Sequence, residues 1–178
     1  MKKKNVISLT DGQNSFTIFS LSANVEDFRL AFLLNRKLGL QLHREDNLMV
    51  FPDSKSDPTP FSFFHFNRDK QTCFYLIHNL NEQQPLINNY FLLINGFFTP
   101  GDENDLLSAI GEIHEVLSVN PFKLSESHSS KKGQKKTLEL INAILTDLEY
   151  HTLEVNRKKN EGQVQLKIKE PTSIKKLY

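Results

Sequence analysis

Hydrophobic periodicity divides the first two thirds of the chain into alternating strands and helices. Residues 15–22 (SFTIFSLS) are β-branched and aromatic, which predicts a strand. Residues 24–39 (NVEDFRLAFLLNRKLG) carry apolar side chains at helical spacing, with Asn24 as the expected cap and Gly39 at the stop. The breadth of the apolar stripe indicates that this helix lies on a sheet. The stripe contains Phe28, Leu30, Phe32, Leu33, Leu34 and Leu38.

The same reasoning predicts five further elements. Residues 47–51 form a short strand, residues 61–78 an aromatic hairpin, and residues 90–98 (YFLLINGFF) a central strand. Residues 100–117 form a second helix with Asp102 as its cap, and the chain returns as an edge strand that ends near Pro121. This order predicts an α+β fold: a mainly antiparallel sheet with two helices on one face, like an elaborated ferredoxin-like arrangement, plus a C-terminal helix and strand.

The composition changes after residue 124. Residues 125–136 (SESHSSKKGQKK) are polar and typical of a linker between a domain over 1–124 and a basic appendage over 137–178. The appendage begins with a helical stripe, and residues 162–171 alternate like a half-exposed strand. The chain has a formal net charge of +1, but residues 1–123 hold 11 basic and 14 acidic residues and residues 124–178 hold 11 and 7.

The order of these segments resembles the IPExxxVDY family of Bacteroidetes proteins. The resemblance begins at FTIFSLSANVEDFRLAFLLNRKLGLQLHREDNLMVF and continues through the aromatic hairpin and YFLLINGFF, so it covers roughly residues 15–123. The motif that names the family falls on IGEIHEVLS, which keeps Ile110, Glu112 and Val116 but replaces its Pro, Asp and Tyr. The resemblance implies no catalytic residues.

The aromatic hairpin FSFFHFNRDKQTCFYLIH holds the only cysteine, Cys73, and two of the six histidines. A turn at NRDK (67–70) would pair Phe64 with Cys73 and His65 with Thr72. Alternation then places Cys73 and His65 on opposite faces, and His78 about 20 Å from His65 on the same face. The expected register therefore excludes a thiol–imidazole pair and a metal pair, and makes Cys73 a small buried apolar residue.

No other part of the sequence predicts a catalytic, metal or cofactor site. The remaining histidines show no metal-ligand spacing, and the phosphate-loop, dinucleotide, hydrolase and HExxH motifs are absent. The charge clusters HRED (43–46) and DEND (102–105) are interpreted as the end of a connector and as anions at a helix N-terminus.

Both faces of the hairpin are apolar, and two helices on one side cover only one of them. The other must meet another layer, a partner protein or a ligand, because a large exposed apolar patch is disfavoured. The C-terminal segment could cover it within the chain, or a second copy of the chain could pair with it. The candidate interface side chains are Phe63, Phe74, Leu76, Leu138, Ile141, Leu145 and Leu148.

The basic C-terminal region is the second candidate surface. Its charges could contact RNA through counterion release, although only two tyrosines are available there for base stacking. The candidate nucleic-acid contacts are Lys131, Lys132, Lys135, Lys136, Arg157, Lys158 and Lys159.

A single cysteine and the lack of an apolar leader or a spanning apolar run favour the cytoplasm. The sequence favours a non-enzymatic binding or assembly module that is homodimeric, has no cofactor and does not contact a membrane. An RNA-associated protein and a small-ligand sensor or enzyme are the alternatives.

Overall fold

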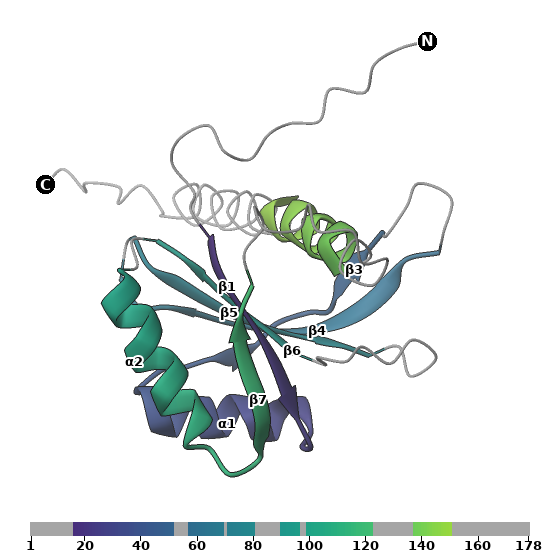
Figure 1. Ribbon diagram of the computed structural model, residues 1–178. Coiled ribbons are helices and arrows are strands. Elements are labelled where there is room, and N and C mark those ends of the chain that lie inside the picture. Colours follow the sequence, from purple (N-terminus) through teal and green to yellow (C-terminus); the bar gives the residue numbers. More distant parts are fainter. Residues whose placement is uncertain are drawn as a thin grey trace, which may run out of the picture.

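The computed structural model describes residues 16–51, 57–69, 71–80, 90–96, 99–122 and 137–150. These residues form an open antiparallel sheet of seven strands with helices against both faces (Figure 1), which confirms the α+β prediction. The strands are β1 (Phe16–Ala23), β2 (His43–Arg44), β3 (Leu48–Val50), β4 (Thr59–Asn67), β5 (Cys73–Asn79), β6 (Tyr90–Asn95) and β7 (Val116–Pro121). The described helices are α1 (Asp27–Leu38), α2 (Pro100–Gly111) and a third helix over residues 137–150.

The sheet has the order β2-β4-β5-β6-β1-β7, and β3 also pairs with β4 beside β2. The apolar run at 90–98 supplies β6, which lies inside the sheet between β5 and β1, as its lack of alternation predicts. The predicted edge strand is β7, which pairs with β1. The predicted strand at 162–171 lies outside the described residues.

Helices α1 and α2 cover one side of the sheet, which we call the first face. Leu30 and Leu34 of α1 and Ile110 of α2 are buried there against β1, β5 and β6. Phe28 and Phe32 were expected in the buried stripe, but they are 66% and 53% exposed. At 3.6 residues per turn, a stripe centred on residues 30, 31 and 34 leaves positions 28 and 32 on the side of the helix that faces solvent.

The helix ends differ from the expected caps. Helix α1 begins at Asp27 after Glu26, whose side chain makes no capping hydrogen bond, so Asn24 is not the cap; Gly39 ends the helix in the left-handed conformation as predicted. Helix α2 is capped by Thr99, and Asp102 returns the bond in a capping box. This helix ends at residue 111 rather than 117, because the chain turns there into β7.

The third helix covers the opposite side of the sheet, the second face. Its buried side chains are Ile141, Ile144, Leu145 and Leu148, and they pack on Ile18, Phe61, Phe63, Tyr75, Ile77, Phe91 and Leu93. The Asp147 carboxylate also accepts the backbone N–H of Phe51 at 3.2 Å. Residues of the same chain therefore bury the second face of the hairpin.

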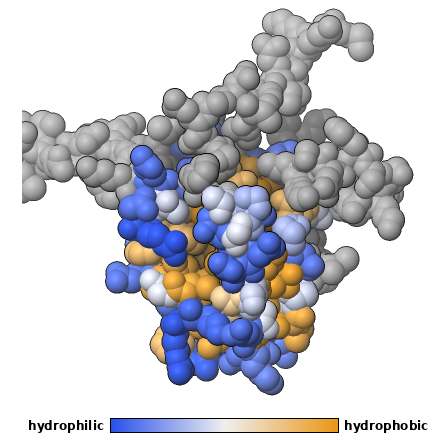
Figure 2. Space-filling view, turned by 60° about the vertical axis from the view of Figure 1, so that its left-hand side comes forward, coloured by the Kyte–Doolittle hydropathy of each residue, from blue (hydrophilic) through white to orange (hydrophobic). Residues whose placement is uncertain are grey.

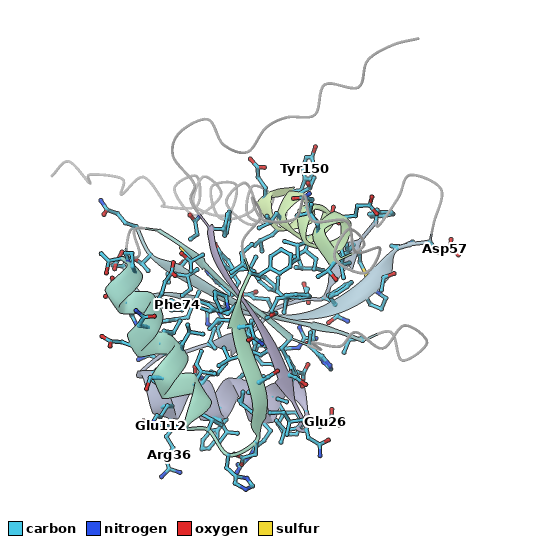
Figure 3. The ribbon with its side chains drawn as sticks, viewed as in Figure 1. Glu26, Arg36, Asp57, Phe74, Glu112 and Tyr150 are labelled. Carbon is cyan, nitrogen blue, oxygen red and sulfur yellow. The ribbon has the colours of Figure 1, made fainter. Side chains whose placement is uncertain are left out.

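The candidate interface residues consequently pack within the chain. Phe74 and Leu76 lie in the first-face core, and Phe63, Ile141, Leu145 and Leu148 in the second-face core, while Leu138 is half-buried. Phe74 lies between the sheet and α2, whereas Tyr150 points away from the sheet (Figure 3). On the face seen in Figure 2, apolar patches remain between hydrophilic side chains. The linker at 125–136 and the candidate nucleic-acid contacts lie outside the described residues.

Candidate metal centre

The register of the β4–β5 hairpin decides which side chains meet. Phe66 pairs with Phe74, His65 with Tyr75 and Asn67 with Cys73, which is a shift of three residues from the predicted pairing. An odd shift exchanges the faces of one strand relative to the other. The prediction that Cys73 and His65 lie on opposite faces is therefore wrong: both lie on the second face.

A longer loop explains the shift. The strands are joined by residues 68–72, and the backbone N–H of Arg68 donates to the Thr72 carbonyl at 2.9 Å. Within the loop, Oδ1 of Asp69 accepts the backbone N–H groups of Gln71 at 2.7 Å and Thr72 at 2.8 Å. The aspartate thus satisfies the loop backbone, which a tighter turn at 67–70 would not require.

Strand β2 brings a second histidine and a carboxylate beside His65. His43 lies directly opposite His65 in the β2–β4 pairing, with their rings edge to face at 5.5 Å. Glu45 is two residues beyond His43, and its backbone N–H donates to the Phe63 carbonyl at 2.9 Å. Successive side chains of an extended segment alternate, so His43 and Glu45 project to the same side.

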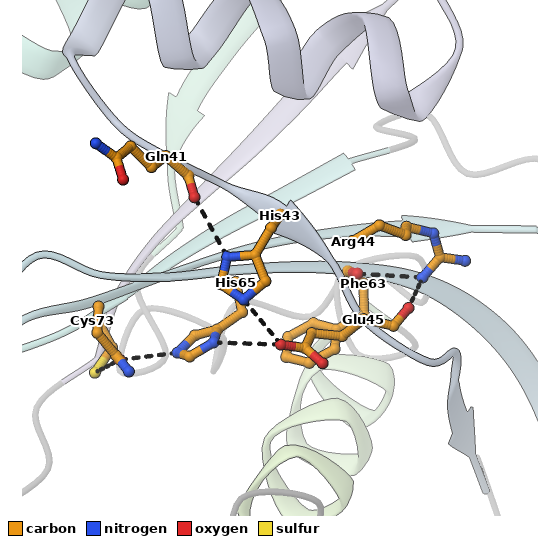
Figure 4. Close-up of polar contacts among 8 residues, drawn as sticks. Gln41, His43, Arg44, Glu45, Phe63, His65 and Cys73 are labelled. Atoms are coloured by element: carbon orange, nitrogen blue, oxygen red, sulfur yellow. Dashed lines mark hydrogen bonds and ion pairs between the residues drawn. The ribbon is translucent and has the colours of Figure 1, made fainter.

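The Glu45 carboxylate lies between the two imidazoles (Figure 4). Its Oε1 is 3.0 Å from Nε2 of His43 and 3.9 Å from Nδ1 of His65. One ligand atom from each of the three residues lies within 4.8 Å of the others. We call His43, Glu45 and His65 the Glu45 cluster.

Arg44 anchors this edge of the sheet from the intervening position. Its guanidinium donates to the Phe63 carbonyl at 3.2 Å and also to the Glu45 carbonyl and the Asn47 side chain. The same group lies over the Phe64 ring, 5.5 Å from its centroid. Arg44 therefore holds the short β2 backbone against β4 and fixes the positions from which His43 and Glu45 project.

The three side chains of the cluster differ in their exposure to solvent. The side chains of His43, Glu45 and His65 are 59%, 34% and 22% exposed. The His65 ring stacks on Tyr75 at 5.2 Å. Burial, with a smaller contribution from the adjacent Cys73 thiol, raises the pKa of Tyr75. The Tyr75 side chain that packs against His65 is therefore an uncharged phenol at neutral pH.

The spacing of the cluster fits a small divalent cation. Zinc bonds to nitrogen and oxygen are roughly 2.0–2.2 Å, so neighbouring ligand atoms in a tetrahedron are about 3.4 Å apart. The distances from Oε1 of Glu45 to the two imidazole nitrogens, 3.0 and 3.9 Å, lie on either side of that value. All three atoms lie within 4.8 Å of one another, so coordination requires the side chains to draw closer together.

The hydrogen bonds of the two rings decide which nitrogen carries the proton. Nδ1 of His43 faces the Gln41 carbonyl at 3.4 Å, and Nε2 of His65 faces Oδ1 of Asn67 at 2.8 Å. An oxygen acceptor at one ring nitrogen favours the proton there and the lone pair on the other nitrogen. In His65 that other nitrogen is Nδ1, 3.9 Å from Oε1 of Glu45. In His43, Nε2 donates its proton to the same carboxylate oxygen at 3.0 Å, so His43 must give up or move this proton when a metal binds.

The sequence predicts no metal site, whereas the structure brings together three candidate ligands. The spacing His43-x-Glu45 was the available signal, since alternation puts both side chains on one face. It was missed because HRED was interpreted as the end of a connector, whereas residues 43–44 pair with β4. The DEND cluster does serve a helix N-terminus, as predicted, through the Asp102 capping box.

The other described histidines lie away from the cluster. His78 was expected on the face of His65, but it lies on the opposite side of the sheet, where it stacks on Tyr90 at 4.3 Å. Burial lowers the pKa of His78, so its imidazole is neutral at pH 7. His114 is exposed after α2, and residues 128 and 151 lie outside the described part of the chain.

Comparison with known proteins adds no assignment. No protein-family model matches the chain, and no curated protein is significantly similar to it. Within the described residues, no helix is long and apolar enough to span a membrane.

Proposed function

We propose that this protein is a non-enzymatic binding module whose ligand is a divalent transition-metal ion of the zinc type. The observation that carries the proposal is the convergence of two imidazole nitrogens and one carboxylate oxygen within 4.8 Å of one another. Two nitrogens and one oxygen suit zinc and its neighbours, whereas magnesium and calcium prefer all-oxygen sites.

The Glu45 cluster lies apart from two hollows of the described surface. Two hollows in the described surface have volumes of about 620 and 240 Å³. One lies beside the start of α1, and the other lies between the end of α1 and α2. Neither is lined by a residue of the Glu45 cluster, so neither would hold a substrate against a metal bound there.

The short β2 strand makes the site dependent on the sheet. His43 and Glu45 come from an edge segment, and His65 comes from β4, so the three ligands meet only when these two segments pair. Binding to the folded chain alone stabilises it by mass action, by about 2.7 kcal/mol at a metal concentration 100 times the Kd.

The test is a zinc titration of the full chain after chelator treatment, by calorimetry and by competition with a chromophoric chelator. We expect one equivalent per chain. His43→Ala and Glu45→Gln should each weaken binding by more than the roughly 10–100-fold typical of losing an outer hydrogen-bond partner.

The matched control is His114→Ala, which removes another exposed histidine of the described chain. It should leave affinity and stoichiometry unchanged. Tight one-to-one binding that survives the His43→Ala/His65→Ala double substitution would contradict the proposal, as would no binding by the unsubstituted chain.

A further inference from the structure

Two hydrogen-bond donors converge on the side-chain oxygen of Asn67, the last residue of β4. Nε2 of His65 lies 2.8 Å from Oδ1 of Asn67. The thiol of Cys73 donates to the same oxygen, also at 2.8 Å. We infer that Asn67 is a positioning residue for the metal site, that it selects the tautomer of His65, and that Cys73 holds its amide in the required orientation.

The tautomer matters because a neutral imidazole carries one proton on two nitrogens. With the amide oxygen facing Nε2, the proton sits on Nε2, and Nδ1 offers a lone pair toward Glu45. With the amide turned over, an N–H group would face Nε2 and drive the proton onto Nδ1. That ring could not bind a metal through Nδ1, so the orientation of one amide decides whether His65 is a ligand.

Cys73 biases that orientation because its thiol is a donor. Cys73 lies directly opposite Asn67 in the β4–β5 pairing, so the backbone register fixes the approach of sulfur to the amide. An oxygen facing the thiol accepts its hydrogen, whereas an amide nitrogen there would meet sulfur, a weak acceptor. Cys73, Asn67 and His65 therefore form a hydrogen-bonded chain across the hairpin, which we call the relay.

The shifted register is what creates this relay. Asn67 and His65 are two residues apart on β4 and share a face, and Cys73 joins that face only because the loop spans five residues. The bonds from Asp69 to the backbone of Gln71 and Thr72 hold that loop in place. The only cysteine of the chain thus acts here as a hydrogen donor to an amide.

This inference rests on the proposed function, and zinc affinity is its first readout. Asn67→Leu removes the acceptor and should weaken zinc binding by about 10–100-fold at unchanged stoichiometry. Asn67→Asp keeps an oxygen at the same position and should restore binding to at least the original affinity. Cys73→Ala should weaken binding less than Asn67→Leu, and Cys73→Ser, which keeps a donor, should leave it unchanged.

The second readout needs no metal. Long-range ¹H–¹⁵N spectra of the metal-free full chain report which imidazole nitrogen of His65 carries the proton. We expect the Nε2–H form in the unsubstituted chain and in Asn67→Asp, and a mixture of forms in Asn67→Leu. Asn142→Ala, an exposed asparagine on the third helix, is the control for both readouts.

The two proposals fail in different ways. If the unsubstituted chain binds no zinc at the cluster, the proposed function fails, and the spectra still decide the tautomer. If Asn67→Leu and Asn67→Asp weaken zinc binding equally without changing the His65 spectrum, Asn67 is only structural and the inference is overturned. The Cys73→Ala and Cys73→Ser pair keeps the test decisive should Asn67→Leu fail to fold.

Discussion

Helices bury both faces of the sheet, but these helices occupy different positions in the sequence. The first face is covered by α1 and α2, which lie in sequence between strands of the sheet they cover. The second face is covered by the third helix, which follows all seven described strands. Leu34 on the first face and Ile144 on the second are both buried, so local packing alone does not distinguish the faces.

The two faces differ in what happens to the sheet when a covering helix detaches from it. Helix α1 connects β1 to β2, and α2 connects β6 to β7, so neither can leave without pulling on strands at both ends. The third helix can leave the sheet while every described strand pairing stays intact. We therefore expect the second face to open in a local unfolding event of lower free energy than global unfolding.

The largest expected effect comes from a buried charge on each face. Leu34→Asp places a carboxylate without partners in the first-face core and should unfold the domain, with a loss above about 4 kcal/mol. Ile144→Asp should instead release the third helix while the sheet stays folded. Hydrogen exchange measures the difference: amides of β5 and β6 lose protection in the first variant and keep most of it in the second.

A matched control separates burial from charge. Asn142→Asp adds the same charge on the exposed side of the third helix and should change stability by less than about 0.5 kcal/mol. Equal loss of strand protection in Leu34→Asp and Ile144→Asp would show that the two faces unfold as one unit, and the contrast drawn above would be wrong.

Truncation to alanine should have a smaller effect and tests whether the faces are independent. Leu34→Ala and Ile144→Ala should each lower the free energy of unfolding by about 2–5 kcal/mol, through lost burial and the cavity left behind. The two side chains belong to separate core clusters on opposite sides of the sheet. The losses of unfolding free energy should add in the double variant to within about 0.5 kcal/mol. Denaturant unfolding of the two single variants and the double variant measures these losses. A larger deviation would mean that the sheet transmits strain between its faces.

The same contrast separates what the sequence predicts from what it leaves open. Strands and helices were predictable wherever the local pattern was strong, as in the helical periodicity of α1 and the continuous apolar run of β6. The helical stripe from residue 138 was also visible, but periodicity cannot say which surface a helix will cover. Its packing on the second face depends on contacts between segments far apart in the sequence.

The hairpin register was unpredictable for a related reason. Phe63 and Phe64 on β4, and Tyr75 and Leu76 on β5, bury apolar groups on both sides of the sheet, so a shifted register costs no burial. Alternation specifies register strongly only where one face is buried and the other is polar, because a one-residue slip then moves apolar side chains to the polar face. The loop therefore sets the register, because Asp69 accepts two of its backbone N–H groups. The Glu45 cluster depends in addition on the long-range pairing of β2 with β4.

The smallest predicted effect concerns the local anchoring of α2 on the first face. The Thr99 hydroxyl accepts the Asp102 backbone N–H at 3.2 Å, and the Asp102 carboxylate accepts the Thr99 backbone N–H at 2.9 Å. Thr99→Ala should therefore cost about 1 kcal/mol, and Thr99→Ser should cost much less.

The loss should also depend on pH. Hydrogen bonds from the Thr99 side chain and then from its backbone lower the pKa of Asp102 below its ordinary value of 3.8. A carboxylate with a lowered pKa stabilises the fold fully at pH values above its unfolded value, and this stabilisation disappears as the pH falls through the folded value. The difference in unfolding free energy between the unsubstituted chain and Thr99→Ala should thus be constant near neutral pH and shrink below about pH 3.8. A difference that instead grows on acidification would show that Asp102 does not close the capping box, and that packing against the sheet alone determines where α2 begins.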